Sequence, residues 1–93
     1  MTNNLWVDDE REPPEHWIWA KTNADAIEWL TKVRVQHLSL DYSLRGETTD
    51  DIMYWLKEHP ERWPTGSIAG HSSSRDGVRL IEQMAKDFAP VRG

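Results

Sequence analysis

The sequence predicts an α/β fold built on a parallel sheet, and three observations support this. Short apolar runs alternate with amphipathic stretches of about a dozen residues, which is typical of strands joined by helical crossovers. Turn-forming residues separate these pieces, and the apolar runs end in polar or charged residues. The 93-residue chain carries no internal repeat and no Gly/Ser linker, so residues 1–93 are expected to form one domain with one modest core.

The first half of the chain is expected to hold three strands and one helix. Residues 5–7 form a short apolar run that ends in two aspartates, as expected for a buried strand, and residues 17–20 follow the same pattern. Residues 22–33 begin with a capping pair and continue as an apolar helical stripe. Residues 35–41 again end in an acid and predict the third strand.

The second half is expected to hold two helices and one strand. A second helix is expected to be capped by Thr48 or Thr49 and to end before Pro60. Residues 67–70 form a weak fourth strand. Ser73 then caps a third helix over residues 75–88, whose apolar side chains recur every three or four residues.

Composition excludes several classes of protein. The net charge of −5 argues against broad binding to a nucleic-acid backbone, and the absence of cysteine excludes disulfide scaffolds and thiolate sites. No apolar stretch approaches the ~20 residues that span a bilayer, so we expect a cytoplasmic protein without a membrane partner. The six tryptophans are expected to fill the core, with Trp63, close to two prolines, as the exposed exception.

The carboxyl edge of the predicted sheet is the expected site. Right-handed crossovers bring the ends of parallel strands to one edge, where ligands bind in open sheets. The residues that follow the four predicted strands include Asp8, Asp9, Lys21, Asp41, His71 and Ser72.

The segments at 5–11 and 38–42, together with a fourth strand followed by hydroxyl residues, resemble the receiver domains of two-component signalling over nearly the whole chain. Pro13 and Pro14 occupy the span of the usual first helix, and the sequence ends before a fifth strand with its lysine. The resemblance therefore implies a truncated receiver-like (flavodoxin-like) three-layer fold, with about four parallel strands in the order 2-1-3-4 and three helices. The missing lysine argues against a phosphoacceptor regulator.

Three motifs in order resemble a divergent branch, the cyclic-phosphate processing receiver-like domains. They are Asp-Asp-Glu-Arg-Glu-Pro at 8–13, Asp41, and His-Ser-Ser-Ser-Arg-Asp-Gly at 71–77. The resemblance implies a domain from bacteria or their viruses that binds or processes a cyclic phosphate, on an RNA 2′,3′-cyclic-phosphate end or a cyclic nucleotide. It thus connects the chain with RNA repair or nucleotide signalling, and with a possible phosphoesterase activity.

The residues at the sheet edge suit that chemistry. His71 is expected to transfer protons, because its ordinary pKa lies near neutrality, and the resemblance places Asp41 beside it as a catalytic residue. Asp8, Asp9 and Asp41 are expected to hold Mg²⁺, which prefers oxygen ligands. A solvated edge on which these acids cap turns is the alternative.

Four further residues are expected to bind the phosphate. Ser72 and Ser73 lie at the start of the third helix, where free N–H groups bind anions, although these serines also serve as caps. Arg11 could provide a bidentate contact, and Lys21 a point charge. An intrachain partner for Arg11 and a surface role for Lys21 are the alternatives.

A noncatalytic interaction protein is the second class of function. Without the first receiver helix and a last one, one face of the sheet lacks its usual cover, while parallel sheets are normally buried on both faces. We expect the third helix to cover that face; otherwise a protein partner or a second copy would have to pack there.

Overall fold

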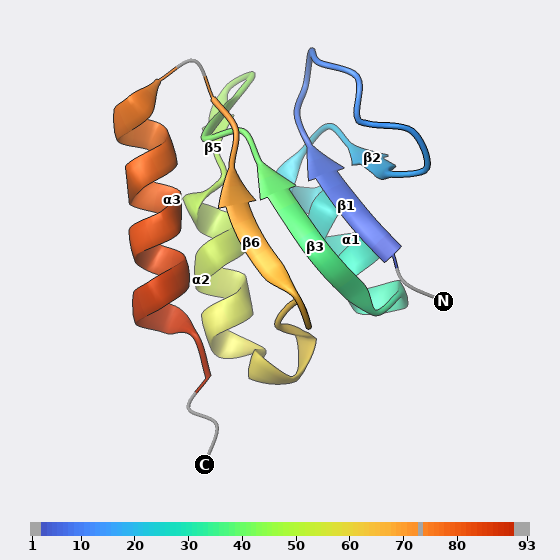
Figure 1. Ribbon diagram of the computed structural model, residues 1–93, viewed down its shortest axis with the longest axis vertical. Helices are drawn as coiled ribbons and strands as arrows, with labels where there is room; N and C mark the ends of the chain where they lie inside the picture. The colour runs from blue at the N-terminus through green and yellow to red at the C-terminus, as the bar shows by residue number, and fades with distance from the viewer. Residues whose placement is uncertain (1–2, 73, 91–93) are drawn as a thin grey trace.

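The computed structural model describes residues 3–72 and 74–90, and its centre is a four-stranded parallel sheet (Figure 1). β1 (Asn3–Val7) lies between β2 (Ile18–Ala20) and β3 (Val35–Leu40), and β6 (Ser67–Gly70) pairs with the other side of β3. The predicted α/β fold class is confirmed. The predicted strand order 2-1-3-4 is confirmed too, because β6 is the fourth strand of this sheet in chain order. Within the described residues, no helix joins β1 to β2 and no strand follows β6.

The first helix follows β2, the second follows a hairpin after β3, and the third follows β6. α1 (Asn23–Lys32) begins as predicted, with the Thr22 hydroxyl accepting a hydrogen bond from the Asp25 N–H. α2 (Asp50–Glu58) leads into the short 3₁₀ helix η1 (Pro60–Arg62). α3 (Arg75–Phe88) is capped by Ser74, whose hydroxyl accepts from the Gly77 N–H, so the cap lies one residue later than predicted.

A short hairpin between β3 and α2 was not predicted. It consists of β4 (Ser43–Leu44) and β5 (Glu47–Thr48), joined through Gly46, which has a positive φ of 80°. Asn23 at the start of α1 fixes the second strand: its N–H donates to Glu47 and its side-chain amide donates to the Thr48 carbonyl. Strands of two residues are too short to show a period in the sequence.

The core lies on one face of the sheet. Leu5 and Val7 of β1 and Leu38 and Leu40 of β3 point to this face and are fully buried. The helices add apolar side chains to the same cluster, among them Leu30, Ile52, Leu56, Ile81 and Met84. Trp63 also joins the cluster at 9% exposure, so the prediction that it is exposed was wrong. The turn at η1 directs the indole inward although prolines lie close to it.

The expected position of the third helix was wrong. α3 packs against β6 and α2, and a Cβ on Gly70 would meet Val78 at 3.1 Å. Its buried residues share the core with α1 and α2, so the described helices form a single layer instead of covering both faces. Figure 1 shows the sheet in front of α1 and α2, with α3 beside β6. No described helix covers the opposite face, which carries Trp6, Ser39 and Ala69; we call it the open face.

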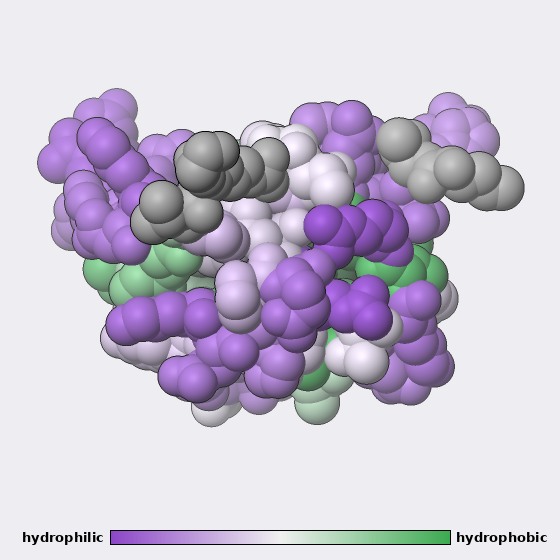
Figure 2. Space-filling model, turned by 90° about the horizontal axis from the view of Figure 1, so that it is seen from below, coloured by the Kyte–Doolittle hydropathy of each residue, from purple (hydrophilic) through white to green (hydrophobic). Residues whose placement is uncertain are grey.

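The surface at the amino-terminal ends of the strands is mostly hydrophilic, with only small separate apolar areas (Figure 2). Among the described residues, no helix is both long and apolar enough to cross a membrane.

Candidate functional site

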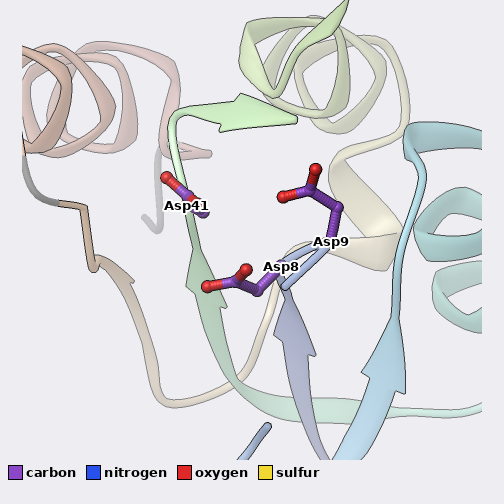
Figure 3. Close-up of side chains that lie close together, drawn as sticks. All are labelled: Asp8, Asp9 and Asp41. Atoms are coloured by element: carbon purple, nitrogen blue, oxygen red, sulfur yellow. The ribbon is translucent and has the colours of Figure 1, made fainter. Parts of the chain in front are cut away.

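Three carboxylates converge at the carboxyl edge of the sheet. Asp8 and Asp9 directly follow β1, and Asp41 follows the neighbouring β3, so adjacent parallel strands deliver them to the same place (Figure 3). One carboxylate oxygen of each lies within 4.8 Å of those of the other two. Asp8 is fully buried, and the other two are half-buried. Such close like charges are unfavourable unless a cation or proton is shared among them.

Asp8 is held by hydrogen bonds on both oxygens. Its Oδ1 accepts from the backbone N–H groups of Glu10 (2.8 Å) and Arg11 (2.9 Å), and its Oδ2 lies 3.0 Å from Nε2 of His71. Burial raises the pKa of Asp8, but the hydrogen bonds from Arg11, Glu10 and His71 outweigh burial and place that pKa below its ordinary value. Asp8 is therefore ionised at neutral pH.

His71 links Asp8 to Ser39, near the carboxyl end of β3. Its Nδ1 lies 2.7 Å from the hydroxyl oxygen of Ser39, and its ring stacks on Trp6 with 3.7 Å between ring centroids. Burial lowers the pKa of His71, although the carboxylates of Asp8 and Asp41 raise it. The hydrogen-bond network assigns the neutral tautomer in which Nε2–H donates to Asp8 and the serine hydroxyl donates to Nδ1. Both ring nitrogens are thus occupied by protein groups.

Two indoles fix the turn that presents the acids. The Trp19 N–H donates to the carbonyl of Asp8 (2.7 Å), and the Trp6 N–H donates to the carbonyl of Arg11 (2.9 Å). Both tryptophans are half-buried on the open face, in adjacent register positions of β2 and β1. The open face thus contributes to the shape of the site.

A cleft of about 370 Å³ lies above the carboxylates. It is lined by Asp8, Asp9, Glu10, Arg11, Asp41, Ser43, Leu44, Arg45, Ser72 and Ser74. The expected phosphate-binding residues Arg11 and Ser72 are therefore beside the acids. Lys21 is not in this lining, and its ammonium lies over the Trp19 ring, 4.4 Å from the centroid. Ser73 falls outside the described residues.

The motif glycine at position 77 has a packing role. A Cβ there would lie 2.7 Å from Cβ of Tyr42, the residue after Asp41. The close approach sets the start of α3 against the end of β3, which brings Ser72 and Ser74 to the cleft.

Sequence reasoning did not identify Ser39 and Arg45. Ser39 sits inside a strand, where its outward position is also that of an ordinary surface residue, and only the neighbouring His71 gives it a role. Arg45 belongs to the unpredicted hairpin. The pair Arg45-Gly46 indicates a turn, but it gives the arginine no role at the site.

The acids fit a hard divalent cation. Three carboxylates form an oxygen donor set of the kind Mg²⁺ prefers. The Asp8 carboxylate already accepts three hydrogen bonds of the roughly four that a carboxylate can accept, so Asp9 and Asp41 have more free lone pairs.

Comparison with known families gives one match. The model of the cyclic-phosphate processing receiver domain matches residues 3–87, a span that includes every described strand and nearly all of α3. No curated protein and no solved structure matches the chain. The match covers both acidic motifs and the segment from His71 to Gly77.

Proposed function

The chain belongs to the family of cyclic-phosphate processing receiver domains, and we propose that it binds a cyclic phosphate, of a nucleotide or an RNA end, together with Mg²⁺ in the cleft. The observation that carries this proposal is the convergence of three carboxylates beneath a cleft that also has two arginines. Carboxylates alone would repel a phosphate. A divalent cation held by them would attract it instead.

Five residues that line the cleft have a role in this proposal. Asp8, Asp9 and Asp41 hold the cation, which when bound neutralises charge on the phosphate oxygens. Arg11 donates to the phosphate from the turn after β1. Ser72 contributes a hydroxyl close to the start of α3, and the amino-terminal end of a helix favours anions. Ser73 and Lys21 belong to the proposed set on the basis of sequence only.

The geometry supports binding more than turnover. Hydrolysis would need His71 or Asp41 to accept or donate a proton at the reacting oxygens. Both nitrogens of His71 are bonded within the protein, so the ring must leave Asp8 or Ser39 before it can act as acid or base. We therefore place a binding domain ahead of a phosphoesterase.

Calorimetric titration with 2′,3′-cyclic AMP tests the proposal. Wild type should bind the nucleotide with Mg²⁺ present and much more weakly in EDTA. Asp41→Asn should abolish the effect of Mg²⁺, whereas Asp51→Asn, at an exposed aspartate of α2, should leave it intact. Binding that needs no Mg²⁺ or survives Asp41→Asn would contradict the proposal.

Hydrolysis is followed in the same samples. Release of a linear monophosphate by wild type and not by His71→Ala would assign proton transfer to His71. Binding without any product would identify a sensor or a sequestering protein.

The open face favours a second function, the binding of a protein partner or of a second copy. Trp6, Trp17 and Trp19 are half-buried there, and no described helix covers them. Because the third helix packs elsewhere, this function ranks above catalysis. Light scattering tests the homodimer: a dimeric mass supports it, and a strict monomer with no tryptophan accessible to a soluble quencher contradicts an open binding face.

A further inference from the structure

We infer that Arg45, at the tip of the β4–β5 hairpin, is a second arginine of the cleft that contacts the phosphate. It comes from a different element of the fold than Arg11. The inference rests on the proposed function and deepens it, because it assigns the selectivity of the cleft for an anionic phosphodiester to a pair of arginines. Ser43, Leu44 and Arg45 line the same cleft as the three aspartates. In Figure 3 the chain turns directly from Asp41 into β4, which passes close to the carboxylates.

Both arginines have guanidinium groups available for a ligand. Both are exposed, and within the described ranges neither forms an ion pair within 4.0 Å, although four carboxylates line the cleft with them. A guanidinium can donate two parallel hydrogen bonds to phosphate oxygens. Arg11 comes from the turn after β1 and Arg45 from the hairpin, so two separate elements can donate to one phosphate.

The charges of the cleft indicate why a second arginine is needed. Asp8, Asp9, Glu10 and Asp41 outnumber the two guanidiniums by two, so one divalent cation would make the lining formally neutral. A phosphodiester anion then meets no net repulsion. Without Arg45 the lining would keep one excess negative charge even with the cation bound. That excess would weaken phosphate binding but would not weaken cation binding.

The hairpin holds Arg45 in a defined place. Gly46 follows it with a φ of 80°, a conformation that glycine adopts without strain. Asn23 ties the following strand to α1 through Glu47 and Thr48. Arg45 therefore projects from a turn whose following strand is anchored to α1.

The test compares two ligands across matched variants. Calorimetry measures Mg²⁺ alone, then 2′,3′-cyclic AMP in saturating Mg²⁺, for wild type, Arg45→Gln, Arg45→Lys and the control Arg79→Gln, an exposed arginine of α3 outside the cleft. Arg45→Gln should bind the nucleotide about tenfold more weakly and Mg²⁺ at least as tightly as wild type. Arg45→Lys should recover part of the nucleotide affinity, and Arg79→Gln should match wild type.

The outcomes separate this inference from the proposed function. Nucleotide affinity of Arg45→Gln equal to wild type overturns the role of Arg45 alone. Loss of both nucleotide and Mg²⁺ binding in that variant also overturns it, because the arginine would then support the hairpin structurally. Absence of Mg²⁺-dependent nucleotide binding in wild type rejects the proposed function, and the inference falls with it.

Discussion

Replacing Ser39 with alanine tests the hydrogen-bonded chain from β3 through His71 to Asp8. The hydroxyl lies 2.7 Å from Nδ1 of His71, and Ser39 is only 8% exposed. Alanine would leave that nitrogen without a protein partner. An unsatisfied buried polar group costs ~1–3 kcal/mol. Because the His71 side chain is still 15% exposed to solvent, we expect a loss of stability in the lower part of this range, about 1–2 kcal/mol.

The chain provides a matched control on the same sheet face. Ser67 makes the equivalent contact with Nδ1 of His37 at 2.8 Å, but this pair is exposed. Ser67→Ala should therefore cost less than about 0.5 kcal/mol. Urea unfolding measures both differences, and in thermal melts ~4–8 °C per kcal/mol is expected for a domain of this size.

Equal effects of the two substitutions would refute this reasoning. Water would then reach Nδ1 of His71 from the open face and replace the hydroxyl at no cost. A larger loss in Ser39→Ala, without a change in the urea m-value, would confirm that the serine stabilises the folded state.

Three further predictions concern stability. In EDTA, the free energy of unfolding should fall as the pH falls below about 6.5, the ordinary pKa of histidine, because burial lowers the pKa of His71 in the folded state and the unfolded chain therefore takes up the proton first. His71→Gln should flatten the dependence of this free energy on pH between pH 7 and 5, as measured by urea unfolding. An unchanged pH dependence in that variant would contradict the reasoning. Trp63→Ala should lose ~3–5 kcal/mol, because the indole is nine-tenths buried in the core, and a urea midpoint close to wild type would contradict that burial. Gly77→Ala should destabilise despite the ~1 kcal/mol helix preference for alanine, since its Cβ would meet Tyr42 at 2.7 Å; a higher melting temperature would show that Tyr42 moves aside.

Local signals in the sequence were sufficient for most of the fold. The capping pair of Thr22 and Asp25 and the bounds of β6 are found as expected, because both depend on neighbouring residues. The predicted side of the sheet for α3 was wrong, because the apolar stripe of this helix fits either face, and its position depends on how it packs against β6 and α2. The predicted exposure of Trp63 was wrong because nearby prolines indicate a turn but not the direction of the side chain.

The candidate site was predictable to the extent that strand ends determine it. Asp8, Asp9 and Asp41 meet because parallel strands in the expected order end at one edge. The partners of His71 were not predictable, since Ser39 and Trp6 come from other strands and contact it only through sheet register. Arg45 depends on a hairpin with no periodic signal.

Trp6 takes part in both the candidate site and the open face, which links the two thermodynamically. Its ring stacks on His71, which donates to Asp8 beneath the cleft, and the same ring is part of the open face. Any molecule that shifts this indole when it covers the open face also changes the free energy of the contact between His71 and Asp8. Linkage then requires reciprocity: a ligand at the carboxylates changes the affinity for that molecule by the same factor by which the molecule changes the affinity for the ligand.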